Sequence, residues 1–148
     1  MKNLFFLILG LLIILGSIFL FFKKSLNEEN LVKIIKINDV SIEVEIADTI
    51  ETRMRGLSYR EFLANGRGMF FIFDKPSRYG FWMKDMHFAI DIVWIDERFR
   101  VIDIEKSVSP ETFPKVFYPN EVVKYVLELD AGFSDEHSID IGKMVYFD

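Results

Sequence analysis

The feature that most constrains this chain is an uncharged apolar run from Leu4 to Phe22, which two lysines follow. A helix needs about 20 apolar residues to cross the hydrocarbon core of a bilayer, so the run is long enough to span one. A cleaved signal peptide has a shorter apolar core and small residues at its cleavage site, whereas this run ends in two phenylalanines. A buried helix of a soluble domain is the alternative, but a run rich in isoleucine and phenylalanine without a polar face rarely forms one. We therefore predict an uncleaved transmembrane signal anchor in residues 1–24.

Charges on the two sides of the run leave its orientation open. Lys2 precedes the run, whereas Lys23, Lys24, Lys33 and Lys36 follow it. By the positive-inside rule, this small bias would keep the rest of the chain in the cytoplasm.

Composition limits what the rest of the chain can do. Of its 148 residues, 51% are hydrophobic, which is enough for one domain with a real core. Cysteine is absent, which excludes disulfides, thiolate metal ligands and a cysteine nucleophile. The three lysines that flank the run leave 15 of the 18 basic residues to face 23 acids, a net charge of −8. Nucleic acid is therefore not an expected partner.

Two apolar patterns after the anchor predict a β-rich domain. From Val40 to Ile46, apolar residues alternate with polar ones, so one face of a strand is buried and the other is wet. From Gly68 to Phe73 every residue is apolar, which is typical of a strand covered on both faces. Residues 25–38 are then a tether and possible first strand, and residues 39–148 a single β-rich domain. Further strands are expected at residues 31–37, 81–83, 90–95, 99–106, 122–129 and 144–147.

Turn and cap signals predict the short helices. Asp48 and Glu51 form a capping-box pattern, which predicts a helix of about two turns before Gly56. Another single turn is expected from Ser58, and Asp130 is a candidate cap for a short helix near the C-terminus. Asn38 and Asp39 suit a tight turn between the first two strands.

The remaining patterns complete the expected fold. In residues 99–106 the apolar positions change from one strand face to the other, which predicts a bulge near Val101. Residues 107–120 contain three prolines and predict a long irregular loop. The expected fold is mainly β, with about eight short strands and two or three short helices after the transmembrane helix. The strands would form an antiparallel β-sandwich or a partly open barrel.

The stretch from Phe81 to Asp96 holds both tryptophans and the side chains best suited to chemistry. In an extended strand, Asp85 and His87 would share a face, and a carboxylate beside an imidazole is the minimal unit of a general base or a metal site. A surface ion pair is the simpler alternative for these two residues. The serine-elbow, phosphate-loop, dinucleotide and zinc-helix motifs do not occur, so we predict no catalytic residue, metal or cofactor.

Five residues are expected at a ligand-binding surface. Trp82 beside Lys84 could form an apolar platform that stacks on a sugar ring, a base or a peptide side chain, although both tryptophans could instead fill the core. Asp91 lies between two isoleucines and, if buried, needs a donor such as Arg55 or Lys84, in a site or in a structural pair. Arg55 also suits the C-terminal end of a helix, where positive charge is stabilising. The expected ligand-binding residues are Arg55, Trp82, Lys84, Asp85 and Asp91.

Seven segments that follow one another from about Asp39 to the end resemble the uncharacterised family known as domain of unknown function 192. They are residues 44–49, 55–60, 68–73, 81–84, 90–96, 125–129 and 131–133. The chain departs from the family pattern at Asp85, where asparagine is usual, and at Ala89, where proline is common. The resemblance implies a compact β-sandwich of jelly-roll type, in members that are often exported or anchored outside the membrane. It implies no established activity.

These observations lead to one functional hypothesis and two alternatives. We expect a membrane-anchored, extracytoplasmic binding or accessory domain, which uses the surface near Arg55, Trp82, Lys84 and Asp85 to hold a small polar ligand, a glycan or an envelope protein. The bilayer would be contacted through residues 4–22. One alternative is a hydrolase-type enzyme in which Asp85, His87 or Asp91 is the acid or base. The other is a scaffold whose tryptophan-containing stretch is all core.

Overall fold

The computed structural model describes Gly16 and residues 32–147. The predicted anchor at residues 1–24, Gly16 apart, and residues 25–31 of the predicted tether and possible first strand lie outside the described residues. The chain divides into two units, Met1–Asn30 and Leu31–Asp148, and the second contains every described strand. Of the helices in the described part, none is long and apolar enough to cross a membrane.

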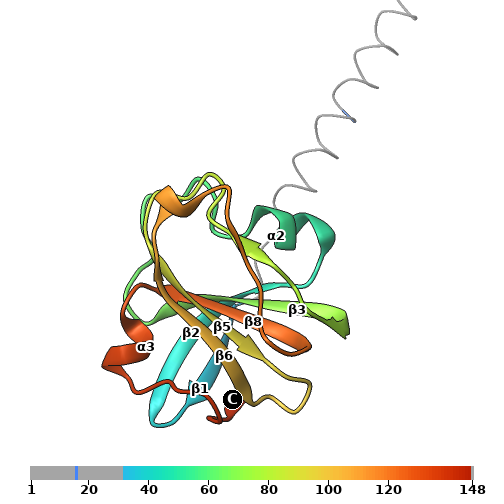
Figure 1. Ribbon diagram of the computed structural model, residues 1–148, viewed down its shortest axis with the longest axis vertical. Helices are drawn as coiled ribbons and strands as arrows, with labels where there is room; N and C mark the ends of the chain where they lie inside the picture. The colour runs from blue at the N-terminus through green and yellow to red at the C-terminus, as the bar shows by residue number, and fades with distance from the viewer. Residues whose placement is uncertain (1–15, 17–31, 148) are drawn as a thin grey trace, which may run out of the picture. The chain divides into compact units, whose positions relative to one another are not determined.

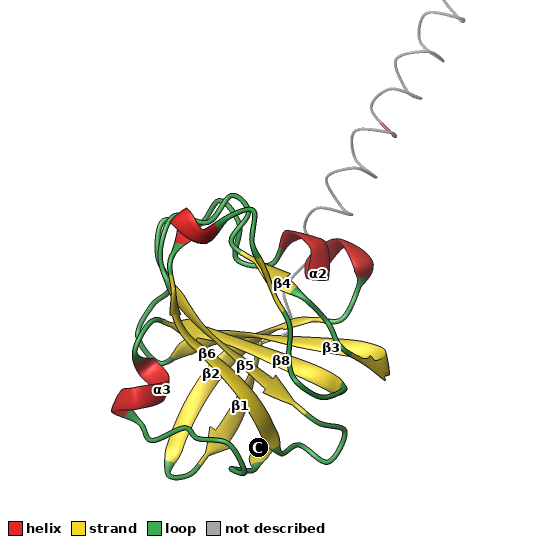
Figure 2. Ribbon diagram, viewed as in Figure 1, coloured by secondary structure: helices red, strands yellow, loops and turns green. Residues whose placement is uncertain are grey.

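The domain is built on one curled seven-stranded sheet, a half-barrel in form (Figure 1). Its strand order is β6-β5-β8-β3-β2-β1-β9. These strands are β1 (Val32–Ile37), β2 (Val40–Ala47), β3 (Arg67–Ser77), β5 (Ile90–Ile95), β6 (Val101–Val108), β8 (Val123–Asp130) and β9 (Val145–Phe147). A separate ribbon pairs β4 (Phe81–Trp82) with β7 (Val116–Phe117). The helices are α2 (Ile50–Arg55), the single 3₁₀ turn η1 (Pro110–Thr112) and α3 (Phe133–Glu136), as Figure 2 shows.

The curl brings the chain before β6 beside the chain before β9. The amide of Val101 donates to the carbonyl of Lys143, and the amide of Val145 donates to the carbonyl of Phe99, both at 2.8 Å. Because the sheet curls in this way, its inner face encloses a core. This inner core is apolar and draws on the strands, α3 and the loop after α3; it contains Ile35, Ile37, Ile42, Val44, Ile46, Phe70, Val93, Ile95, Val101, Leu127, Leu129, Phe133, Ile139 and Val145.

The outer face of β3, β5 and β8 carries a second core. Residues from the sheet, such as Phe71 and Trp94, pack there against Phe117 of the ribbon and Leu57 and Met83 of the connecting loops. The three central strands are therefore covered on both faces, as the apolar run of β3 predicts. The second core supports the candidate site.

Several sequence predictions are confirmed. The domain is mainly β, β5 has the predicted bounds, and Asn38 lies in a turn with φ 55°. The predicted bulge is present, because Trp94 pairs with Asp103 whereas Ile95 pairs with Val101, which leaves one extra residue on β6.

Other predictions are wrong in identifiable ways. The sheet is not wholly antiparallel, because β2 and β3 pair in parallel, and the 19 residues between them are long enough for the required crossover. The cap of α2 is Thr49 rather than Asp48, because Thr49 and Thr52 exchange side-chain to backbone hydrogen bonds at 3.1 and 3.0 Å. The turn expected from Ser58 is not helical. Gly132 precedes α3 without the side-chain cap expected from Asp130.

Asp91 joins β5 to two other parts of the domain. Its side chain is fully buried, and its carboxylate accepts hydrogen bonds from the amides of Ser107 at 2.8 Å, Gly132 at 3.2 Å and Ser134 at 2.9 Å. Neither Arg55 nor Lys84 is its donor. Three backbone amides compensate the burial of the charge, so Asp91 fixes the end of β6 and the start of α3 to β5.

We expect Asp91→Asn to destabilise the domain by about 2–4 kcal/mol, because an amide nitrogen would face backbone donors that need an acceptor. Denaturant unfolding measures the change. Asp130→Asn is the matched control, since it makes the same substitution at an exposed residue that pairs with β5. Equal effects of the two substitutions would contradict this role of Asp91.

Candidate functional site

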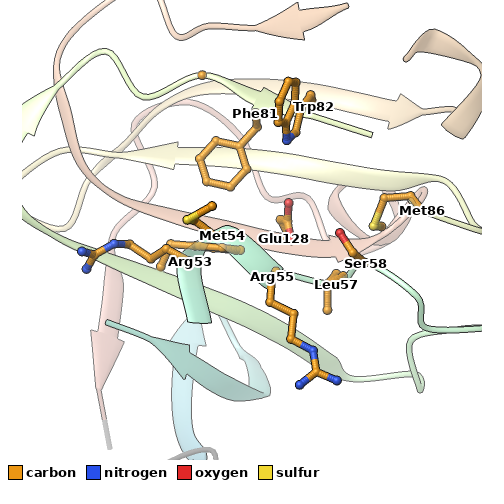
Figure 3. A pocket seen from close by; sticks show the side chains of 12 residues that line it. Arg53, Met54, Arg55, Leu57, Ser58, Phe81, Trp82, Met86 and Glu128 are labelled. Carbon is orange, nitrogen blue, oxygen red and sulfur yellow. The ribbon is translucent and has the colours of Figure 1, made fainter. Parts of the chain in front are cut away.

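A small pocket of about 80 Å³ lies between α2 and β4 (Figure 3). The C-terminal half of α2 and the loop after it form one side, and β4 forms the other. Its lining combines apolar side chains with polar groups, among them one acid; it consists of Arg53, Met54, Arg55, Gly56, Leu57, Ser58, Phe71, Gly80, Phe81, Trp82, Met86 and Glu128.

Glu128 is the unusual residue of this pocket. It lies on β8 between Leu127 and Leu129, which belong to the inner core, so its side chain is on the outer face of the sheet. Only 5% of Glu128 is exposed, and its Oε2 atom is buried without a hydrogen-bond partner in the described part of the chain. In Figure 3 its carboxyl group points into the space between Met54 and Ser58. An unpaired buried carboxyl oxygen is costly, so its presence calls for an explanation.

Burial changes the ionisation of Glu128. Desolvation raises its pKa to about 8, and the positive charge of Arg60 only partly opposes this shift. Arg60 is held elsewhere, because its guanidinium group makes a two-point contact with the carboxylate of Glu45 at 2.5 and 2.8 Å. The side chain of Glu128 is therefore mainly protonated at neutral pH.

The mouth of the pocket is aromatic and exposed. Trp82 is 51% exposed and makes an edge contact with Phe113, with ring centroids 5.9 Å apart. The amino group of Lys84 lies 6.0 Å from the centre of the Trp82 ring. Met54 is also exposed. Ligand sites likewise combine apolar and aromatic walls with a few polar groups.

Hydrogen bonds join the loop after α2 to the loop after β4 beside the pocket, an arrangement called the clasp below. The Ser58 hydroxyl donates to the Lys84 carbonyl at 3.0 Å, and the Tyr59 amide donates to the Asp85 carbonyl at 2.8 Å. The Tyr59 hydroxyl donates to the Asp85 carboxylate at 2.8 Å, which raises the pKa of Tyr59. Tyr59 and Asp85 have φ values of 65° and 55°, a conformation that aspartate tolerates better than tyrosine. The clasp therefore holds Ser58 at the pocket with local backbone strain.

The structure brings together only some of the predicted ligand-binding residues. Arg55 and Trp82 line the pocket, and Lys84 lies beside Trp82 at the edge of the pocket. Asp85 is bound to Tyr59, and Asp91 is on the opposite face of the sheet, held by backbone amides.

The remaining candidate, His87, also lies apart from these acids. Its Nδ1 atom is 3.4 Å from the Glu61 carboxylate. Asp85, His87 and Asp91 therefore do not form one acid–base cluster. Throughout residues 32–147, no three histidine or acidic side chains lie close enough to hold a metal ion.

Sequence reasoning missed Glu128. The alternation of β8 places Glu128 on the face opposite Leu127 and Leu129, where a charged residue is ordinarily wet. One feature of the sequence could have pointed to Glu128: it is an acid in the middle of a predicted strand, within a segment that matches the family pattern. Here that face is covered by the second core, and Leu57, Phe81 and Met86 line the pocket together with Glu128.

The raised pKa of Glu128 makes a prediction about stability. Between pH of about 4.5 and about 8 the unfolded chain has released this proton and the folded chain still holds it, so the free energy of unfolding falls as pH rises. Glu128→Gln has no such proton to release, so its free energy of unfolding should not fall in this way. Relative to the native chain, we expect the variant to gain on the order of a few kcal/mol of stability between the low and the high end of this pH window.

Urea unfolding at several pH values measures this difference. The matched control is Glu121→Gln, at an exposed glutamate just before β8. A difference that stays constant from pH 4.5 to pH 8 would contradict the assignment.

The domain is similar to solved structures and to one protein family. A search of curated proteins found no match. A solved structure of a candidate transcription regulator from Sinorhizobium meliloti 1021 is 24% identical, with a TM-score of 0.75 over 80% of this chain and 95% of that one. A protein of unknown function from Novosphingobium aromaticivorans DSM 12444 is 23% identical and has a TM-score of 0.73; the match covers 77% of this chain and 84% of that one. At these identities the likeness establishes the fold alone. The family model DUF192 (Uncharacterized ACR) matches residues 33–147, so the chain belongs to the DUF192 family.

Proposed function

We propose that the domain binds a small polar ligand in the pocket between α2 and β4. The observation that carries this proposal is the carboxyl group of Glu128, which is buried, lacks a partner for Oε2 and borders an open pocket. A ligand that donates a hydrogen bond to this group would remove the cost of leaving it unpaired. The exposed indole of Trp82 would cover the bound ligand.

The arrangement of the acidic side chains favours binding over hydrolysis. A hydrolase needs an acid and a base that both reach the scissile bond of the substrate. Asp85, His87 and Asp91 each interact with a different partner and do not converge on one point. The scaffold alternative accounts for Met83 and Trp94, which are buried. It does not account for Trp82, which is exposed beside an unpaired acid.

We also propose that the domain is anchored to a membrane and lies outside the cytoplasm. The support is the apolar run at residues 4–22 and the frequent export or anchoring of proteins that this chain resembles. The ligand would then be a solute, a glycan or a group on an envelope protein at the cell surface.

Trp82→Ala is expected to weaken ligand binding by about tenfold or more, because the ligand loses its aromatic cover. The measurement is isothermal titration calorimetry of the full-length chain in detergent micelles with a panel of amines, amides and monosaccharides. In the native chain, binding is also followed by the two indole N–H signals in NMR. Trp94 is an internal reference, since it is buried and its Nε1 donates to the carbonyl of Tyr79 at 3.2 Å. Tyr146→Ala removes an exposed aromatic residue that does not line the pocket and is the control. If no compound in the panel shifts the Trp82 signal, the binding proposal is wrong.

Protease added to intact cells tests the topology. We expect it to degrade residues 32–147, because an extracytoplasmic domain is accessible from outside. A cytoplasmic reporter protein is the control for cell integrity. Protection of the domain in intact cells, with degradation after lysis, would contradict the proposed location.

A further inference from the structure

We propose that the ligand of this pocket is a small organic cation, an alkylammonium or guanidinium group, whose charge lies against Glu128 while its apolar part lies against Phe81 and Trp82. This inference rests on the proposed binding function and names the chemical class of the ligand.

The charges around Glu128 leave a place for a cation. No ion pair joins Glu128 to another described residue, and the adjacent residues on β3 and β5 are the neutral Met69 and Ile92. Arg60 acts on Glu128 through its field, but its hydrogen bonds go to Glu45. The buried acid therefore has no cationic partner in direct contact, and a ligand can provide one.

The two arginines of α2 that line the pocket do not fill this role. Arg53 donates to the carbonyls of Asp48 and Ile72 and lies over the ring of Phe73. In Figure 3 the guanidinium groups of Arg53 and Arg55 extend away from Glu128. Their aliphatic parts line the pocket while their charges lie outside it.

The walls suit a cation that has an apolar part. Phe81 and Trp82 present aromatic rings, and Met54 and Met86 present thioethers. Aromatic faces attract cations, and this attraction is larger where water is excluded. On β4 and the following loop, the residues that line the pocket are uncharged. The ammonium group of Lys84, 6.0 Å from the centre of the Trp82 ring, is a positive charge near the mouth, so the bound cation has to lie deeper, beside Glu128. The net charge of −8 after residue 24 also favours the approach of cations over anions.

The volume restricts the size of the bound group. About 80 Å³ is roughly half of the ~150 Å³ of an apolar cavity that holds a benzene ring. The pocket therefore accepts the head of a ligand, a group of a few heavy atoms such as methylammonium or methylguanidinium, while any longer part remains outside under Trp82.

Binding of a cation would be linked to the release of one proton. The carboxyl group must be ionised to pair with the cation, and its pKa in the free protein is about 8. Affinity for the cation is therefore expected to rise about tenfold for each unit of pH from 6 towards 8 and to level off above that. A neutral donor would gain only a stronger hydrogen bond from this ionisation, not the attraction between opposite charges, so its affinity should rise less with pH.

The test compares methylguanidinium with N-methylurea, which have similar planar shapes and differ in charge. The full-length chain in detergent micelles is titrated with each compound at pH 6, 7 and 8, and the Trp82 indole signal is followed with Trp94 as reference. We expect methylguanidinium to bind with an affinity that rises with pH as stated. At pH 8 it should bind at least about tenfold more tightly than N-methylurea.

Two variants complete the design. Glu128→Gln should lose the preference for methylguanidinium and its pH dependence, whereas Glu121→Gln should keep both. If Glu128→Gln does not fold, the pH dependence of the native chain alone decides. Binding of N-methylurea as tightly as methylguanidinium, or pH-independent binding, would overturn the inference and leave the proposed function standing. The absence of a Trp82 shift with both compounds would overturn the inference; the proposed function fails only if the wider panel is also silent.

Discussion

Burial of the central strands on both faces is the constraint on which the rest of this domain depends. β3, β5 and β8 have the inner core on one side and the second core on the other. The curl of the sheet encloses the first, and the ribbon of β4 and β7 with the loops around Leu57 and Met83 covers the second. Because a covered sheet face has no water, each polar group on it needs a partner from the protein or from a ligand.

The two buried acids answer this requirement in opposite ways. Asp91 faces three backbone amides and is fully compensated within the fold. Glu128 has an oxygen atom without a partner in the part of the chain described by the structure. Asp91 therefore has a structural role, whereas Glu128, on the neighbouring strand, is a candidate for ligand recognition. Both are buried, and they differ in their hydrogen bonds.

Much of the fold could be predicted because its strands carry clear patterns. The run at residues 90–95 is apolar around one acid, and β5 begins and ends where that run does. A strand was expected at residues 81–83, and β4 forms there. Its partner β7 was not predicted, because Val116–Phe117 is too short for any periodicity and lies within the segment expected to be an irregular loop. The parallel pairing of β2 with β3 was also missed, since alternation fixes the faces of a strand but not the direction of its neighbour.

The candidate site was predictable only in part, for a related reason. Trp82 and Arg55 were expected at a binding surface, and both line the pocket. The donors of Asp91 are backbone amides, which every residue type provides, so the sequence carries no sign of them. The pocket that Glu128 borders is lined by residues from distant segments, including Leu57 and Phe81, which a sequence pattern does not bring together.

The position of β9 has a consequence for the order in which the domain is assembled. The last strand pairs with the first, Val145 opposite Ile37, across more than a hundred residues of chain. Contacts so distant in sequence slow folding, because the intervening chain must first be brought into place. The half-barrel therefore reaches its final form only after β9 has been synthesised. Until then the outer edge of β1, where β9 will pair, remains available to other strands.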